Sequence, residues 1–127
     1  MSVDHYLYLS FDDGPHPEVT PLVLDILKEY NAKATFFCIG KNVAAYPSVY
    51  QRIIDEGHAV GNHTYNHLNG WKTGTDEYID NIKDAANLIE SNLFRPPYGR
   101  ITKKQICVLR SSPNLPNQII MWDVLSG

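Results

Sequence analysis

Cysteine is scarce in this sequence, with two residues among 127. Two cysteines cannot form the disulfide framework of a small secreted domain, and their apolar surroundings predict that Cys38 and Cys107 are buried thiols. No run of about 18 apolar residues occurs, so no segment is expected to span a membrane. The net charge is -3 and no basic cluster or arm is present. The chain therefore lacks the basic surface that is typical of a nucleic-acid-binding protein.

Two further absences concern the ends of the chain. No signal-peptide pattern precedes the first expected strand, which predicts a cytoplasmic location as written, or an extracellular or cell-envelope location if a leader was removed. No histidine follows His67. With 43% hydrophobic residues, the length predicts one globular domain over residues 1–127.

The remaining pattern alternates between strands and helices. Expected strands cover residues 6–11, 34–39, 58–61, a short segment from 94, and 118–122; expected helices cover 17–30, 47–56, 76–91 and 102–110. This order predicts parallel strands with helices outside them. In the first helix, the predicted buried stripe consists of Val19, Leu22, Val23, Ile26 and Leu27.

Two carboxylates, Asp12 and Asp13, stand where Gly14 and Pro15 end the first strand. Adjacent carboxylates repel each other unless a cation lies between them. A metal on one of them would resolve this and leave the other for acid–base chemistry. A plain turn or helix-cap pair is the alternative interpretation.

A second motif supplies two imidazoles four residues apart, His63 and His67, and a single helical turn would place both on one face. Such spacing is common among metal ligands, although a hydrogen-bonded surface pair shares it. The neighbouring aspartates favour a metal site. Zinc is the expected ion because the spare carboxylate suits hydrolysis; cobalt and nickel are alternatives, and the set also matches non-haem iron. His16 and His58 are expected to be structural.

The third motif runs from Arg95 through Pro96 and Pro97 to Tyr98 and Gly99. The prolines donate no backbone hydrogen bonds, so the N–H groups of Tyr98 and Gly99 are the expected donors to an oxyanion. The guanidinium of Arg95 is expected to brace a carboxylate bidentately. A rigid surface turn is the alternative interpretation.

These three motifs, in this order and spacing, resemble those of the polysaccharide deacetylases, the NodB-homology family of carbohydrate esterases. The resemblance covers nearly the whole chain. It implies a deformed (β/α) barrel and metal-dependent removal of N-acetyl or O-acetyl groups from a polysaccharide such as chitin oligomers or peptidoglycan.

The resemblance also implies roles for individual residues. Asp12 would be the general base, and Asp13, His63 and His67 would bind the metal. Arg95 would brace Asp12, while the Tyr98 N–H would hold the oxyanion. Contacts with the substrate are expected from Pro97, Tyr98 and Trp122.

The sequence departs from the family pattern near its end. Asp123 to Gly127 resembles the opening of a fourth motif, and the fifth, with its general-acid histidine, is absent. The barrel is therefore expected to be C-terminally incomplete, with little deacetylase activity. The chain is expected either to self-associate through the open edge of the first strand or to fold only marginally. Two other functions stay open: a non-catalytic carbohydrate- or metal-binding domain, and hydrolysis of another C–N bond such as a cyclic imide or ureide.

Overall fold

A computed structural model describes residues 9–122 and contains one parallel sheet in the order β1-β2-β3-β4-β5. The strands are β1 (Leu9–Gly14), β2 (Ala34–Cys38), β3 (Ala59–Asn62), β4 (Leu93–Phe94) and β5 (Gln118–Ile119). The helices are α1 (Val19–Glu29), α2 (Gly40–Ala45), α3 (Pro47–Asp55), α4 (Thr75–Ala86) and α5 (Lys103–Arg110), with 3-10 turns η1 (Gly70–Lys72) and η2 (Pro97–Gly99).

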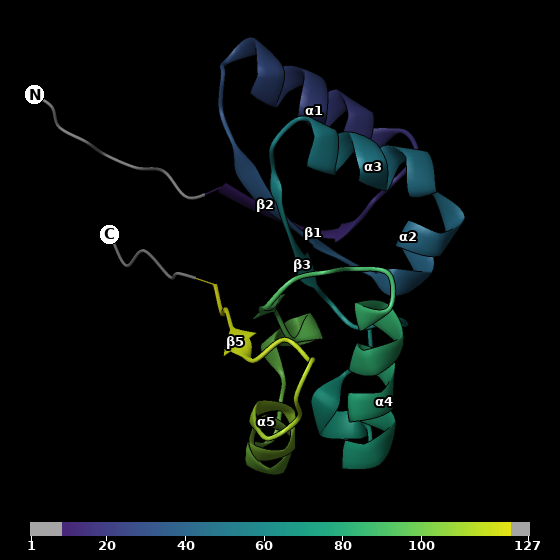
Figure 1. Cartoon of the computed structure of the whole chain (residues 1–127), viewed down its shortest axis with the longest axis vertical. Helices are drawn as coiled ribbons and strands as arrows, with labels where there is room; N and C mark the ends of the chain where they lie inside the picture. The colour runs from purple at the N-terminus through teal and green to yellow at the C-terminus, as the bar shows by residue number, and fades with distance from the viewer. Residues whose placement is uncertain (1–8, 123–127) are drawn as a thin grey trace, which may run out of the picture.

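The helices lie outside the sheet in two groups (Figure 1). Helices α1 and α3 pack together beside β1–β3, and α4 and α5 pack together farther along the sheet. Two apolar clusters fill the space beneath them. The first is centred on Leu24, Phe36, Cys38, Ile53 and Ile89, and the second on Tyr78, Ile79, Ile82, Phe94 and Leu109. The predicted alternation, and a (β/α) barrel that the described residues leave open, are confirmed.

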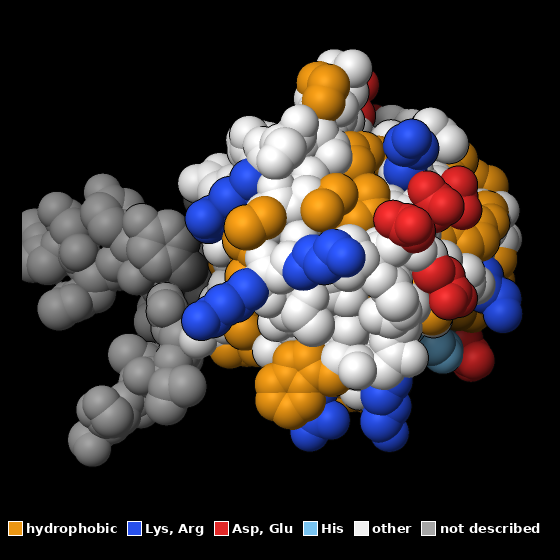
Figure 2. Space-filling view, turned by 90° about the horizontal axis from the view of Figure 1, so that it is seen from below, with side chains coloured by type: hydrophobic (Ala, Val, Ile, Leu, Met, Phe, Trp, Pro, Cys, Tyr) orange, Lys and Arg blue, Asp and Glu red, His pale blue; other side chains and the backbone are white. Residues whose placement is uncertain are grey.

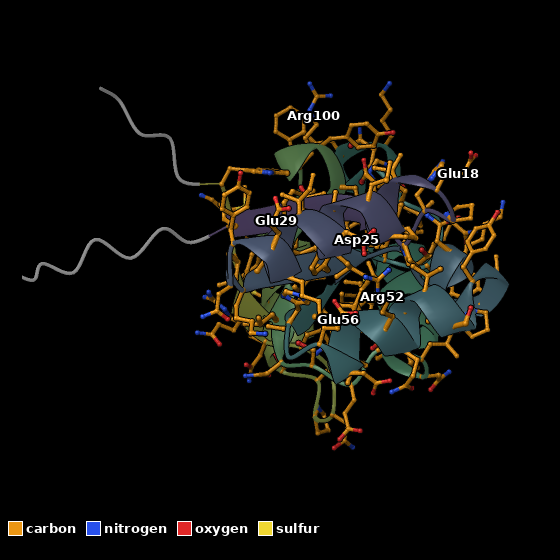
Figure 3. The ribbon with its side chains drawn as sticks, turned by 90° about the horizontal axis from the view of Figure 1, so that it is seen from above. Glu18, Asp25, Glu29, Arg52, Glu56 and Arg100 are labelled. Carbon is orange, nitrogen blue, oxygen red and sulfur yellow. The ribbon has the colours of Figure 1, made fainter. Side chains whose placement is uncertain are left out.

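The buried face of α1 differs from the predicted stripe. Leu24 and Leu27 are buried together with Thr20, whereas Val19, Leu22 and Ile26 are 54%, 62% and 56% exposed. Because the helix turns its 20/24/27 face to the sheet, the three exposed residues point away from it, while Val23 is half-buried against the core as predicted. Helix α3 packs beside α1. Polar side chains join the two helices, since Arg52 contacts Asp25 at 2.5 Å (Figure 3).

Several element boundaries also differ. Helix α2 was not predicted: Gly40, expected to close a strand, begins this helix. Helix α4 ends at Ala86 rather than at residue 91, and β5 ends at Ile119. The first three residues of the predicted strand 6–11 lie outside the described residues. Cys38 is buried as expected, but Cys107 is exposed on α5, so the prediction of two buried thiols was wrong for Cys107. No helix in the described part is long and apolar enough to cross a membrane.

Candidate metal centre and general base

The three motifs meet at the carboxyl ends of the parallel strands. Asp12 and Asp13 belong to the last residues of β1, His63 follows β3, and Arg95 follows β4. Register explains the meeting, since the C-terminal residue of β3 pairs with β2 on one side and β4 on the other. Residues distant in sequence therefore share one edge of the sheet, the usual place for chemistry in α/β folds.

An irregularity in β1 separates the two aspartates. The pairing of β1 with β2 shifts between Asp12 and Gly14, and Asp13 has a φ of 72°. A regular strand would point these neighbours to opposite faces. The bulge instead re-aims Asp13, as bulges near functional sites commonly do. Asn42 fixes this position by donating its side-chain N–H to the Asp13 carbonyl at 2.9 Å.

The segment carrying the histidines is an irregular loop, so the predicted helical turn between His63 and His67 was wrong. Thr64 and His67 both have positive φ values, 61° and 58°, which no α-helix accommodates. Buried amides replace the missing helical hydrogen bonds. Asn62 accepts from the Thr64 N–H at 2.9 Å, and Asn81 accepts from two further loop N–H groups at 2.8 Å each.

Asn62 and Asn81 were missed by the sequence analysis. Asn62 is fully buried and also donates to the Ile82 carbonyl at 3.0 Å, which ties the histidine loop to α4. Asn81 lies on that same helix and donates to the Asn66 side chain at 2.9 Å. The available signal was an asparagine inside the otherwise apolar face of a predicted helix, because a buried amide needs partners.

The side chains of Asp13, His63 and His67 converge on one point. Their ligand atoms lie within 4.8 Å of one another. The Nε2 atoms of His63 and His67 are 3.2 Å and 3.1 Å from the same oxygen, Asp13 Oδ1. Asp13 remains 62% exposed at its side chain, so solvent or substrate has access to the open side of the cluster. One carboxylate and two imidazoles with an open side fit a divalent metal ion.

Hydrogen bonding sets the tautomer of His63. Its Nδ1 lies 2.6 Å from the Arg95 carbonyl oxygen, which only accepts, so Nδ1 carries the proton and the Nε2 lone pair faces Asp13. Burial lowers the pKa of His63 and so favours the neutral ring that a metal requires. The tautomer and the lowered pKa of His63 therefore support a metal site, in addition to the spacing of the residues in the sequence.

Asp12 is held beside this cluster by Arg95. The Nη1 atom of Arg95 donates to Asp12 Oδ1 and to Ser10 Oγ, at 2.9 Å each, and its Nε donates to the Ile120 carbonyl at 3.2 Å. Arg95 thus contacts Asp12 through one nitrogen, and the bidentate geometry expected from the sequence was wrong. The guanidinium is buried over the ring of Phe37, at 4.2 Å, so this contact is firmly positioned.

Trp122 engages the other oxygen of Asp12. Its indole N–H donates to Asp12 Oδ2 at 3.0 Å, and its ring lies 5.0 Å from the Arg95 guanidinium carbon. Trp122 was expected to contact substrate, and this stays a prediction. The structure shows that Trp122, 43% exposed, orients the Asp12 carboxylate. The next residue, Asp123, lies outside the described residues.

The proline loop presents one free donor. Gly99 N–H donates to the Pro96 carbonyl at 3.0 Å, so Gly99 is occupied and its predicted oxyanion contact was wrong. Tyr98 has a φ of 63°, and its N–H makes no hydrogen bond within residues 9–122. The ring of Tyr98 lies 4.8 Å from that of His67 and is exposed. Pro97 is buried, so its ring offers little exposed surface to a substrate.

The other described histidines have structural contacts, as predicted. His16 Nδ1 accepts from the N–H groups of Glu18 and Val19 at the start of α1, at 3.1 Å and 3.0 Å. His58 is buried, and its Nδ1 accepts from the Ala34 N–H at 3.1 Å. Both rings therefore accept hydrogen bonds from backbone N–H groups through Nδ1.

Comparison with known proteins assigns this chain to a family. A family model described as polysaccharide deacetylase matches residues 2–113. A peptidoglycan-N-acetylglucosamine deacetylase of Bacillus cereus is 41% identical over 122 residues, which cover 91% of this chain and 43% of that relative. A chitooligosaccharide deacetylase of Azorhizobium caulinodans is 43% identical over 73% of this chain and 48% of its own length. The chain thus spans less than half of these two relatives.

The fold agrees with the sequence comparison. A crystal structure of a peptidoglycan N-acetylglucosamine deacetylase superimposes with a TM-score of 0.85 at 41% identity, covering 92% of this chain and 56% of that one. The resemblance seen in the three motifs is confirmed: the chain belongs to the polysaccharide deacetylase family.

Proposed function

We propose that this protein is a metal-dependent hydrolase that removes acetyl groups from an amino-sugar polysaccharide. The observation that carries the proposal is the convergence of Asp13, His63 and His67 within 4.8 Å, beside a second carboxylate, Asp12, that Arg95 and Trp122 hold by separate oxygens. Two adjacent aspartates in different surroundings suit two different tasks.

A divalent ion held by Asp13, His63 and His67 would supply Lewis acidity, which polarises a carbonyl and makes water more acidic. Asp12 then acts as the base that takes a proton from the attacking water. Arg95 keeps Asp12 oriented, since its guanidinium donates to Asp12 Oδ1. The Tyr98 N–H points a donor at the negative oxygen that forms on the acetyl carbon. Water adds to that carbon, the C–N bond breaks, and acetate and a free amine result.

The leaving nitrogen also needs a proton. Histidine is the commonest donor, and no histidine follows His67 in this sequence. Acid assistance at this step is worth about 10²–10⁴ in rate.

We propose zinc as the ion and an N-acetylated glycan as the substrate. Two neutral imidazoles and one carboxylate with an open side are typical of a catalytic zinc site. The two relatives above carry names that refer to peptidoglycan and to chitooligosaccharides, and both glycans are built from N-acetylated amino sugars. A braced Asp12 favours hydrolysis over the iron chemistry that shares this ligand set.

The experiment combines metal analysis with acetate release. We expect one zinc per wild-type chain, and an affinity at least about tenfold lower in His63→Ala. Asp12→Asn should keep its zinc and lose the acetate release that the wild type has from chitotetraose. His16→Ala is the control for metal content, because His16 accepts a backbone hydrogen bond at the start of α1 and is not part of the metal cluster.

Three outcomes separate the functions. No metal in the wild type, or equal metal in His63→Ala, would contradict the metal site. Zinc binding with acetate release equal in the wild type and Asp12→Asn would favour a non-catalytic binding domain. Hydrolysis of a cyclic imide or ureide, without acetate release from any glycan, would assign the chain to the other C–N bonds.

A further inference from the structure

A groove of about 550 Å³ leads away from the metal cluster. It is lined by His67, Leu68, Asn69, Lys72, Tyr98 and Arg100. His67, a residue of the metal cluster, therefore forms one wall of the groove. The exposed Tyr98 ring beside it lies 4.8 Å from the His67 ring. A glycan whose acetyl group reaches the metal can extend a neighbouring sugar into this groove.

The groove is assembled from two segments that are locked together. Buried Gln105 donates its side-chain N–H to the carbonyls of Gly70 and Thr73, at 2.8 Å and 3.1 Å. It also completes the capping box of α5 with Thr102. Gly70 packs so closely on this connection that an added Cβ would lie 2.4 Å from the Arg100 carbonyl oxygen. Turn η1 and the start of α5 are thus held in fixed relation.

In this arrangement the Arg100 guanidinium lies over the Trp71 ring. The guanidinium carbon of Arg100 lies 4.8 Å from the Trp71 ring centroid, although both side chains are exposed. The backbone at Trp71 is fixed, because its backbone N–H donates to the Asn69 side-chain oxygen at 2.9 Å. Stacking on a ring orients an exposed arginine without neutralising its charge.

Both charged residues of the groove apart from the metal ligand are cations, Lys72 and Arg100. Within residues 9–122 neither forms an ion pair. Arg100 projects from the surface away from Asp25, Glu29 and Glu56 (Figure 3). Lys and Arg side chains also spread over the end of the molecule seen from below, where Asp and Glu gather at one side (Figure 2). The groove is therefore positive on a chain whose net charge is -3.

We propose that this groove binds an acidic sugar next to the one that is deacetylated, through its carboxylate. The inference rests on the proposed function and deepens it, because it favours glycans whose amino sugars carry a carboxylate over neutral chitin oligomers. Arg100 and Lys72 pair with the carboxylate, and the exposed ring of Tyr98 offers apolar surface to the sugar. A guanidinium supplies planar donors that match a carboxylate.

The test measures binding of two tetrasaccharides of equal length to the zinc-loaded chain at low salt. One is neutral chitotetraose, and the other alternates N-acetylglucosamine with N-acetylmuramic acid, which carries the carboxylate. We expect the acidic glycan to bind about fivefold tighter, and this preference to shrink as salt is raised. Arg100→Gln should abolish most of the preference and leave chitotetraose binding within about twofold.

Two further variants sharpen the result. Arg110→Gln removes the same charge from the end of α5, outside the groove, and should keep the preference. Arg100→Lys should retain part of it, because charge remains and planar geometry is lost. A hexuronic-acid oligomer that competes equally well would identify the carboxylate, rather than the muramic ether, as what is bound.

Failure of this inference is distinct from failure of the proposed function. Equal binding of the two glycans, or a preference unchanged in Arg100→Gln, would overturn the acidic subsite while leaving the metal-dependent hydrolase intact. An equal loss in Arg110→Gln would assign the effect to overall charge and overturn it too. Absence of binding to both glycans would contradict both proposals.

Discussion

Replacing Arg95 with methionine should destabilise the folded chain more than any exposed charge change. Arg95 is 4% exposed, and its guanidinium donates to Asp12, to Ser10 and to the Ile120 carbonyl. These bonds connect β1 with the segment after β5, at opposite ends of the strand order. Methionine fills much of the same apolar space but donates no hydrogen bond.

The expected loss follows from what the substitution leaves behind. The Asp12 side chain is only 18% exposed, so its charge would remain in a poorly solvated place with the indole of Trp122 as its remaining partner. Breaking a buried ion pair by removing one member costs about 3–5 kcal/mol. That is a large fraction of the roughly 5–15 kcal/mol of free energy of unfolding typical of a domain.

Urea unfolding followed by circular dichroism measures this loss. The matched control is Arg52→Met, because Arg52 also contacts two carboxylates, Asp25 and Glu56, but its side chain is 32% exposed. Exposed pairs contribute about 0.2–1 kcal/mol each, so the control should lose much less. If Arg95→Met changed the free energy of unfolding by less than about 1 kcal/mol, or no more than the control, the reasoning about the buried pair would be refuted.

Three further predictions use residues outside the site. Burial raises the pKa of the Cys38 thiol to about 12, so iodoacetamide should label one thiol, Cys107, in the native chain, and both only after unfolding; two rapid labels would contradict this. Burial lowers the pKa of His58, so the free energy of unfolding should fall as the pH drops below about 6.5, and His58→Gln should flatten that slope; an unchanged slope would contradict it. We expect self-association through the outer edge of β1 and the exposed face of α1, so Leu22→Lys should lower the sedimenting mass; a monomeric wild type would contradict this.

The order of the elements and the edge of the sheet that carries the chemistry could be predicted from the sequence. Apolar runs ending in glycine or proline identified the strands, and Asp12, His63 and Arg95 each stood at the end of one. Parallel strands bring their carboxyl ends to the same edge, so the meeting of these residues followed from topology without any knowledge of side-chain angles.

Other features depend on tertiary contacts that periodicity does not carry. The stripe in α1 was misassigned because apolar residues occupy nearly its whole circumference, and only the sheet decides which face is buried. The contact between Trp122 and Asp12 joins residues 110 positions apart, and it requires the sheet to curve until its two edges approach. No local pattern predicts a contact that depends on that curvature.

Backbone strain explains why local rules failed at the site in particular. Asp13, His67 and Tyr98 all have positive φ, at 72°, 58° and 63°, a region that residues other than glycine rarely adopt. Each such residue costs of order 1–3 kcal/mol unless its surroundings hold it there. Here the surroundings do: Asn42 binds the carbonyl of Asp13, and Asn81 binds the loop before His67. A strand and a helical turn, the conformations that the sequence favours, would point these side chains apart. The strained conformations bring them together before any ligand arrives, so the free energy of convergence comes from folding and is not subtracted from binding.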